Sequence, residues 1–485
     1  MDTPKLNVKR TLFAGFAFFL IMAFWQAYDA IMPLIMINKF GMNQTLSGAI
    51  MALDNVLAVF LLPLFGSMSD KCTSKQGKRT PFIVAGTLLA VVFFIALTFM
   101  DNYQLMKITE AGVLNTDTSG LPADKAGALM AEKAWAVTLS DPVPMICFII
   151  LLLFTLVAMS LFRSPAVALM PDVTIKPLRS KANAVINLMG TAGGITVLVL
   201  GMIFGTSKNA YMDYTGFVVA TCAVMIIGLI IFVFTVKEPR WNREMLQTQA
   251  EIDALCPENP GHSPGNAAKS YPEKTEKSAL GKEKLISLIL ILASVALWYM
   301  GYNAVTSKYS VYATNILHQN FNLTLLIAQI AAVAAYIPVG IIAGKFGRKK
   351  TIIAGVTLLF AAFLSGVFIR DTTPAFVMYI VFALAGIAWA TINVNSFPMV
   401  VELCSGGNIG KYTGYYYTAS MAAQIITPVL SGLLLDKSML FLFPYASVFV
   451  LLSGITMLFV KFGNAQDLGG KTSKELIEDN FAGDD

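Results

Sequence analysis

Twelve segments of this chain are long and apolar enough to cross a lipid bilayer as helices. The hydrocarbon layer is about 30 Å thick, and a helix rising about 1.5 Å per residue spans it with about 20 apolar residues. Backbone polar groups find no water there, so a spanning segment must satisfy them within a helix or a closed barrel. Only 13% of the 485 residues are charged, about half the share in soluble domains. We therefore expect an all-α integral membrane protein with helices at residues 12–37, 46–69, 81–100, 144–171, 182–206, 216–236, 285–313, 322–344, 350–369, 374–403, 411–435 and 441–462.

Basic residues gather in alternate connections between these segments. The clusters fall at 5–10, 71–79, 176–181, 237–243 and 345–350, and Lys411 continues the alternation. Short cytoplasmic loops carry an excess of Lys and Arg, so both termini are expected in the cytoplasm of a plasma-membrane protein. The formal net charge of +6 follows from this bias and does not indicate a nucleic-acid partner.

Two inserts and a polar tail interrupt the apolar pattern. Residues 101–143 form an outer insert in which only the 130s favour a helix. Residues 238–283 are rich in Pro, Gly, Ser, Glu and Lys with few aromatic residues, which is typical of a mobile linker. These boundaries predict a six-helix bundle at 1–237, a cytoplasmic linker at 238–283, a second bundle at 284–463 and a disordered tail at 464–485.

An internal repeat relates the two predicted bundles. The string AYDA at 27–30 returns as GYNA at 301–304, and Pro63 returns as Pro338, each about 275 residues later. The common order and offset of these matches predict two bundles related by a pseudo-two-fold axis, with a substrate site between them at the membrane midplane.

Three charged residues lie inside predicted spans. Asp29, Asp54 and Arg163 each fall within about 8 Å of the midpoint of their segment at 1.5 Å per residue. Charges at this depth are costly and mark functional positions by default. The structural alternative is a salt bridge between Arg163 and one acid, which leaves the other acid as a candidate for ion coupling.

Two prolines free backbone carbonyls close to polar side chains. Pro33 removes the hydrogen bond to the carbonyl of Asp29, so a carboxylate and a free carbonyl lie together. Pro428 does the same for the carbonyl of Gln424. Such a pair suits a proton or a small cation, and the alternative is that each proline only shapes its helix.

Aromatic and amide or acid side chains recur together on three predicted helices. At helical spacing, Trp25 shares a face with Asp29, and Tyr299 shares one with Asn303. Sugars need flat apolar surfaces and hydrogen-bonding groups for their hydroxyls, although any single aromatic residue is accounted for by packing between helices. The candidate substrate-binding residues are Trp25, Tyr28, Tyr299, Tyr302, Asn303, Trp389, Asn393 and Gln424.

The sequence offers no pattern for a metal site or an enzyme. The five cysteines lack zinc-ligand spacing and the chain has two histidines. It contains no cluster of histidine with acids, no Ser/His arrangement and no nucleotide-binding loop. We therefore expect no catalytic residue, no metal and no cofactor.

The loop between the second and third segments carries the strongest motif. It reads PLFGSMSDKCTSKQGKRTPFI at 63–83. Gly66, Asp70 and Arg79 resemble the signature loop of the major facilitator superfamily. The longer string SDKCTSKQGKRTPFI is similar to the same loop in plant sucrose–proton symporters and their relatives. The alternative is a solvated positive loop with no transport role.

A second stretch, 161–190, is similar to the junction of the fourth and fifth helices in the sucrose carriers. Pro165, Asp172, Arg179 and Asn183 match that pattern. The family's arginine falls at Val167, one turn after Arg163, and the plant carriers' acid falls near Leu156. A coupling acid must therefore lie elsewhere, and Asp29 or Asp54 is the natural candidate. A melibiose-type sodium site is not indicated, because Ala58 stands where the second acid would be.

The resemblance also implies a gate on the cytoplasmic side. Asp70 at the end of its helix is expected to bond to Arg79 and to backbone amides of a neighbouring helix, holding the outward-facing state. Glu402 with Lys411 parallels Asp172 with Arg179 in the second half. The candidate gating residues are Gly66, Asp70, Arg79, Asp172, Arg179, Glu402 and Lys411.

The resemblance implies a twelve-helix facilitator fold and a secondary transporter of the sucrose-symporter or glycoside–cation symporter group. The expected substrates are a sugar or glycoside and a proton, with sodium as the alternative ion, and the expected assembly is a monomer in the bilayer. One rival is a facilitator for another solute, including drug efflux. The other is a membrane receptor or scaffold that does not transport, which the three buried charges disfavour.

Overall fold

The computed structural model describes residues 6–175, 178–255, 282–401, 403 and 409–462, and these residues form helices and connections without strands. The first half contains α1 (Val8–Ala14), α2 (Phe16–Leu34), η1 (Ile35–Lys39), α3 (Gln44–Asp70), α4 (Thr80–Glu110), η2 (Val113–Asn115), α5 (Ala123–Ser140), α6 (Val143–Val173), α7 (Arg179–Phe204) and α8 (Thr215–Thr235). Helix α9 (Glu238–Leu255) follows. The second half contains α10 (Lys282–Tyr312), η4 (Ala313–Leu317), α11 (Phe321–Phe346), α12 (Arg348–Gly366), α13 (Ala375–Val401), α14 (Ile409–Leu435), η5 (Met439–Phe441) and α15 (Leu442–Leu458).

Within the described residues, 11 helices are long and apolar enough to cross a membrane. A shorter apolar stretch, Phe321–Tyr336 of α11, corresponds to the remaining predicted segment. The all-helical membrane architecture expected from the apolar segments is therefore confirmed.

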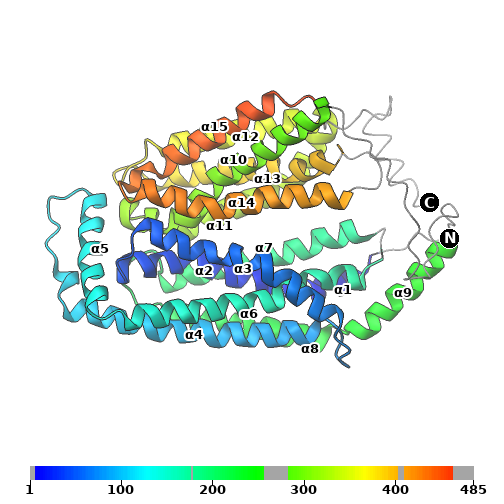
Figure 1. Cartoon of the computed structure of the whole chain (residues 1–485), viewed down its shortest axis with the longest axis horizontal. Coiled ribbons are helices and arrows are strands. Elements are labelled where there is room, and N and C mark those ends of the chain that lie inside the picture. The colour runs from blue at the N-terminus through cyan, green and yellow to red at the C-terminus, as the bar shows by residue number, and fades with distance from the viewer. Residues whose placement is uncertain (1–5, 176–177, 256–281, 402, 404–408, 463–485) are drawn as a thin grey trace.

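The helices form two bundles that lie side by side (Figure 1). Helices α1–α8 make one bundle, called the N-half, and α10–α15 make the other, called the C-half. Helix α5 stands across one end of the molecule, while α1 and α9 lie at the opposite end (Figure 1). Following the predicted topology, the end that carries α5 is called the outer end and the other the inner end.

Small residues let helices within each half approach closely. A Cβ at Gly86 of α4 would lie 2.7 Å from the Cβ of Phe162 on α6. A Cβ at Gly386 of α13 would lie 2.2 Å from the backbone oxygen of Ala328 on α11. Without a hydrophobic drive between helices in lipid, such close packing supplies much of the attraction between them.

Both halves carry a π-helical turn at the outer end of their first long helix. Turn η1 continues α2, and turn η4 continues α10. The two turns meet where Asn315 donates from Nδ2 to Oδ1 of Asn38 at 2.7 Å. π-Turns concentrate at functional positions, and this matched pair lies on the boundary between the halves.

Helix α4 continues ten residues beyond the predicted end of its span. The face that carries Asp101, Gln104 and Ile108 is buried. Asp101 accepts two hydrogen bonds from Lys39 Nζ, at 2.6 and 2.7 Å, and both side chains are buried. The π-turn η1 carries Lys39 back against α4 and Tyr214, whose ring centroid lies 4.6 Å from Nζ.

The predicted linker begins with an ordered helix. Residues 238–255 form α9, which packs against α6, so the expectation of a mobile segment fails there. Pro239 stands in the first turn, where its missing N–H costs nothing, and Trp241 is buried. Residues 256–281 and the predicted tail at 464–485 lie outside the described residues.

We predict that breaking the Lys39–Asp101 pair destabilises the N-half. Lys39→Met leaves a buried carboxylate alone and should lower the free energy of unfolding by about 3–5 kcal/mol. The double change Lys39→Met with Asp101→Leu should restore most of that loss, because neither charge then needs a partner. Thermal unfolding of the purified protein in detergent measures the difference.

The matched control is Lys107→Ala. Lys107 pairs with Asp141 in a partly exposed bridge at the same end, and exposed pairs contribute about 0–1 kcal/mol. Equal destabilisation by both single variants would contradict the role assigned to the buried pair.

Candidate functional site

A central cavity of about 270 Å³ lies between the two halves. Helices α2, α3 and α6 line it from the N-half, and α10 and α14 line it from the C-half. The structure brings together seven of the candidate residues in its wall. They are Trp25, Tyr28, Asp29, Asp54, Arg163, Asn303 and Gln424.

The three ionisable residues share this cavity without a direct ion pair. The side chain of Asp29 is open to it, while Asp54 and Arg163 are half-buried. Asp54 accepts a hydrogen bond from Asn55 Nδ2 at 2.7 Å. The Arg163 guanidinium lies 5.6 Å from the centroid of the Trp25 ring. Among the described residues no salt bridge joins Arg163 to either acid, so the structural alternative of a fixed salt bridge is not formed in this state.

Hydrogen-bond donors in the cavity wall lack partners among the described residues. They are Nε1 of Trp25, the hydroxyl of Tyr28 and Nδ2 of Asn303, all buried. An unpaired buried donor costs about 1–3 kcal/mol. The wall therefore favours a ligand with hydrogen-bond acceptors, and it combines those donors with the flat faces of two aromatic rings.

The remaining aromatic candidates form a separate cluster in the C-half. The Tyr302 and Trp389 rings stack with centroids 3.7 Å apart and planes within 3°, and Tyr299 meets Trp389 edge-on at 5.2 Å. Of the described residues, none of these three nor Asn393 belongs to the lining of the central cavity. In this state they pack against each other, as the packing alternative expects, and their binding role stays a prediction.

An amide pair that sequence reasoning missed joins the halves. Gln329 of α11 donates from Nε2 to Oε1 of Gln26 on α2 at 2.6 Å. Gly194 of α7 packs against both side chains, with an ideal Cβ 3.3 Å from Gln329 and 3.5 Å from Gln26. Gln26 follows Trp25 directly and points to another face of the same helix. The contact depends on the three-dimensional arrangement of α2, α7 and α11, which no sequence pattern indicates.

The predicted gating residues of the N-half form a connected cluster at the inner end. Arg79 donates from Nε to Asp172 at 2.7 Å, from Nη2 to Asp70 at 2.5 Å, and from Nη1 to the hydroxyl of Ser69. Burial opposes the charge of Arg79, but its bonds to Asp172 and Asp70 raise its pKa above the ordinary value. We call Asp70, Arg79 and Asp172 the inner-loop cluster.

Glu238 extends the inner-loop cluster to α9. Its carboxylate accepts from the backbone N–H groups of Lys78, Arg79 and Thr80 at 2.7–2.9 Å, which caps the N-terminus of α4. Gly77 has φ +117°, and a Cβ there would lie 2.3 Å from this carboxylate. Glu238 is the first residue of the predicted linker, and nothing in its sequence context indicates this capping role.

The remaining candidate gating residues are only partly described by the structure. Gly66 is described: it is on α3, where an ideal Cβ would lie 2.8 Å from the Ser164 hydroxyl. Glu402 and the side chains of Arg179 and Lys411 are not among the described residues, so their roles stay predictions.

The two halves are joined at the outer end by a backbone-to-carboxylate contact. Asp436 at the end of α14 accepts from the backbone N–H groups of Gln44 and Thr45, the latter at 3.2 Å, and from the Thr45 hydroxyl. These N–H groups begin α3, where the helix dipole favours an anion. The Pro428 backbone oxygen lies 2.1 Å from an ideal Cβ at Gly48, so only glycine fits the crossing of α3 and α14. We call this contact the outer gate.

Lys308 strengthens the outer gate. Lys308 is fully buried, and its Nζ donates to the backbone oxygen of Gln44 at 3.0 Å. A further bond between the halves runs from Asn322 Nδ2 to the Thr206 hydroxyl at 2.8 Å. The outer end is therefore closed above the central cavity.

Comparisons with known proteins agree with this architecture. The model of the Major Facilitator Superfamily matches residues 14–335 and 290–476. Among solved structures, the chain is similar to the inward-open xylose transporter XylE from E. coli, with a TM-score of 0.59, 13% identity and coverage of 97% of this chain and 98% of that one. It is also similar to a bacterial homologue of the iron transporter ferroportin in an inward-facing state, with a TM-score of 0.63, 12% identity and coverage of 94% and 99%. At this identity the likeness concerns the fold.

Curated relatives match over shorter stretches. The proton-associated sugar transporter A of Homo sapiens is 27% identical over 129 residues, 27% of this chain and 17% of the relative. The sucrose transport protein SUC3 of Arabidopsis thaliana is 27% identical over 173 residues, 35% of this chain and 25% of the relative. The matched parts thus span a quarter or less of these relatives.

We predict that Asp436→Ala opens the outer gate. The change removes an ionised acceptor from the start of α3, and hydrogen bonds to charged groups contribute about 1.5–3 kcal/mol. The fraction of molecules open at the outer end should rise by roughly 10-fold. The measurement is the rate at which a membrane-impermeant maleimide, added outside, labels Ser307→Cys in the central cavity of a chain without its native cysteines.

The control for this labelling experiment is Lys437→Ala, one exposed residue further along. An equal labelling rate in both variants would contradict the gate.

Proposed function

This chain belongs to the Major Facilitator Superfamily and is a membrane transporter, and we propose that it moves a sugar or glycoside together with a proton by alternating access. The two halves rock about the central cavity, which opens to one side of the membrane at a time. The expected location is the plasma membrane, with both termini in the cytoplasm and the monomer as the working unit. The named sugar carriers among its relatives support the substrate class without fixing it.

The observation that carries the substrate class is the wall of the central cavity. Two aromatic faces, two carboxylates and three donors without a partner in the described part of the chain line this cavity of about 270 Å³. A sugar offers hydroxyls that accept from such donors and donate to such carboxylates, and its C–H faces pack on aromatic rings. An apolar drug would leave the donors unpaired, so the efflux alternative is less well supported.

Proton coupling rests on the unequal charges in the same cavity. Asp29 and Asp54 face one arginine, so full ionisation leaves one uncompensated negative charge in surroundings of low dielectric constant. Binding a proton removes that charge. At the repeat-related position the C-half carries Asn303, which cannot ionise, so only the N-half copy can carry the proton. Asp29 is assigned this role because it is open to the cavity, and Arg163 tunes it.

The two gates give the cycle its order. In the state described here the outer gate is closed by Asp436 and Lys308, which corresponds to the arrangement expected for release toward the inner side. Opening the outer end requires α3 to leave α14. The inner-loop cluster is already formed in the present state, and all of its members belong to the N-half. The proposal that Asp70 helps to hold the inner end shut in the outward-facing state therefore requires a further contact from this cluster to the C-half.

We predict that Asp29→Asn separates accumulation from exchange. The amide mimics a protonated acid, so the cavity still binds substrate and changes conformation, but no proton is released. Uptake driven by a pH gradient should fall to the equilibrium level, while counterflow of substrate continues at a comparable rate. Both are measured in the same vesicles with radiolabelled sucrose and a panel of other sugars.

Asp54→Asn is the matched control for Asp29→Asn. Gradient-driven accumulation retained by Asp29→Asn and lost by Asp54→Asn would transfer the role to Asp54. Retention in both would remove proton coupling from these acids.

We predict that Asn303→Ala weakens substrate binding. Its Nδ2 has no partner among the described residues, and the loss of a hydrogen bond to ligand costs about 1–3 kcal/mol. Calorimetric titration should show a Kd higher by roughly 5–150-fold. Asn102→Ala is the control, because Asn102 bonds to Thr215 at the outer end, away from the cavity. Asn393→Ala tests the C-half cluster, and unchanged binding in both Asn303→Ala and Asn393→Ala would place the site elsewhere.

A further inference from the structure

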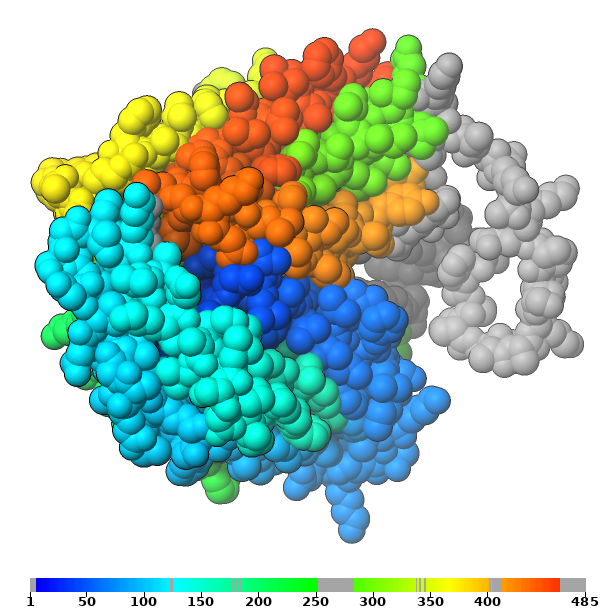
Figure 2. Space-filling model, turned by 60° about the vertical axis from the view of Figure 1, so that its left-hand side comes forward, coloured from blue at the N-terminus to red at the C-terminus, as the bar shows by residue number. Residues whose placement is uncertain are grey.

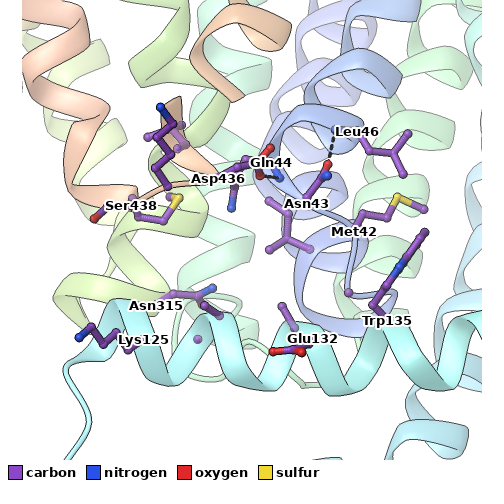
Figure 3. Close-up of a pocket in the computed structure, with 18 of the residues that line it drawn as sticks. Met42, Asn43, Gln44, Leu46, Lys125, Glu132, Trp135, Asn315, Asp436 and Ser438 are labelled. Carbon is purple, nitrogen blue, oxygen red and sulfur yellow. Dashed lines mark hydrogen bonds between the residues drawn. The ribbon is translucent and has the colours of Figure 1, made fainter. Parts of the chain in front are cut away.

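A second cavity of about 440 Å³ lies at the outer end, on the far side of the outer gate from the central cavity. Its roof is helix α5, and its floor is the start of α3 and the end of α14. Asn315 of η4 closes one side. Figure 3 shows Lys125, Glu132 and Trp135 along α5, across the pocket from the floor residues Gln44 and Asp436. We call this cavity the outer pocket.

We propose that the outer pocket is a second binding site for a neutral, hydroxyl-rich ligand of the glycoside type, and that it exists only while the outer gate is closed. The choice of ligand class rests on the proposed function, because a molecule entering from outside passes this pocket on its way to the central cavity. The existence of the site rests on the geometry of the outer end itself.

The roof of the pocket is fixed in place by polar contacts. The Thr138 hydroxyl donates to the backbone oxygen of Phe40 at 2.8 Å, and Gln104 Nε2 donates to Thr138 at 2.9 Å and to the Lys39 oxygen at 3.0 Å. Gly41 has φ +70°, and an ideal Cβ there would lie 2.2 Å from the backbone nitrogen of Trp135. Helix α5 is therefore docked on the first half as a rigid element.

The same helix also reaches the second half. It contacts η4 as well as η1, and Figure 2 shows α5 in cyan beside the orange end of α14 and the blue N-terminal helices. The pocket is thus built from elements of both bundles. Its volume lies within the range of about 300–1,000 Å³ that is usual for small-molecule sites.

The lining matches a neutral polar ligand. Each wall contributes one acid and one base, Glu132 with Lys125 on α5 and Asp436 with Lys437 on α14, so the charges balance. Trp135 supplies an aromatic surface. Gln44 lines the pocket and is 7% exposed, and its buried Oε1 has no partner among the described residues. The buried acceptor of Gln44 and the ring of Trp135, on opposite walls of the pocket, favour a ligand that donates from hydroxyls and packs through C–H groups.

State dependence follows from the floor. The bonds from Gln44 and Thr45 to Asp436 hold the floor together, and the same bonds must break when the outer end opens. A ligand in the outer pocket therefore binds the closed gate better than the open one and shifts the population toward it. High external ligand is expected to slow the return of the carrier to the outside.

The test uses the full-length purified protein labelled with 5-fluorotryptophan. The chain has five tryptophans, and loss of one ¹⁹F signal in Trp135→Phe and of another in Trp25→Phe assigns the outer pocket and the central cavity separately. Sucrose, and then phenyl β-D-glucoside, is titrated to about 50 mM, which detects a Kd in the millimolar range.

The expected result is a saturable shift of the Trp135 signal that persists in Asn303→Ala. It should weaken in Asp436→Ala, because the apparent affinity falls with the fraction of closed molecules. Absence of any shift at Trp135 with both probes would overturn the outer site, whatever happens at Trp25. A shift at Trp135 that Asn303→Ala abolishes would also overturn it, since the signal would then report the central cavity. The response of Trp25 alone bears on the proposed function, so the two can fail independently.

Discussion

A polar group buried in a membrane-spanning protein needs a hydrogen-bond partner within the protein or its ligand. In this protein, buried polar groups that have a partner contribute to the fold, and those without one indicate a binding site. Lys39 pairs with Asp101, and Lys308 pairs with the carbonyl of Gln44. Both lysines are completely enclosed and both have acceptors, so their contribution is to fold and closure. In the central cavity the donors of Trp25 and Asn303 have no partner among the described residues. The cost of leaving them so is the physical reason to look for a ligand there.

The charges and the aromatic stacking are divided between the two halves. The N-half supplies Asp29, Asp54 and Arg163, while the C-half supplies the stacked pair Tyr302 and Trp389. The repeat makes the scaffolds similar, and the divergence of side chains at related positions gives each half a different task. In the proposed function, ion coupling belongs to the N-half, and the C-half lines the central cavity with uncharged residues.

The fold was largely predictable because the features that determine it can be recognised along the sequence, without knowledge of distant contacts. Apolar length, alternating basic loops and the repeat predicted the helices and the pairing into halves, and the motif around Asp70 pointed to the inner-loop cluster. The candidates of the central cavity were predictable because a charge inside an apolar run, such as Asp29, is conspicuous. The outer gate was not predictable from the sequence. Asp436 directly follows the last residue of α14, in no recognisable motif, and it bonds to backbone N–H groups. A partner that is a peptide N–H leaves no pattern in the sequence.

Helix boundaries failed for a related reason. Hydropathy falls at Asp101, so the segment seemed to end there, yet α4 continues to Glu110 because Gln104 and Asp101 find partners on η1 and α5. The same holds for α9, where Glu238 binds the start of α4. In both places the helix is stabilised by contacts with segments distant in sequence, and local composition does not predict such contacts.

Helix α3 connects the two ends of the transporter as one continuous rod. It runs from Gln44 to Asp70, 27 residues, and a helix of that length is about 40 Å long. Its first residues are held by α14, and its last residue is held by Arg79. The contact at its last residue is with the start of α4 in its own half, whereas the contact at its first residues is with α14 of the other half. Separation of α3 from α14 at the outer gate is therefore expected to be transmitted along the helix to the inner-loop cluster, because one helix makes both contacts.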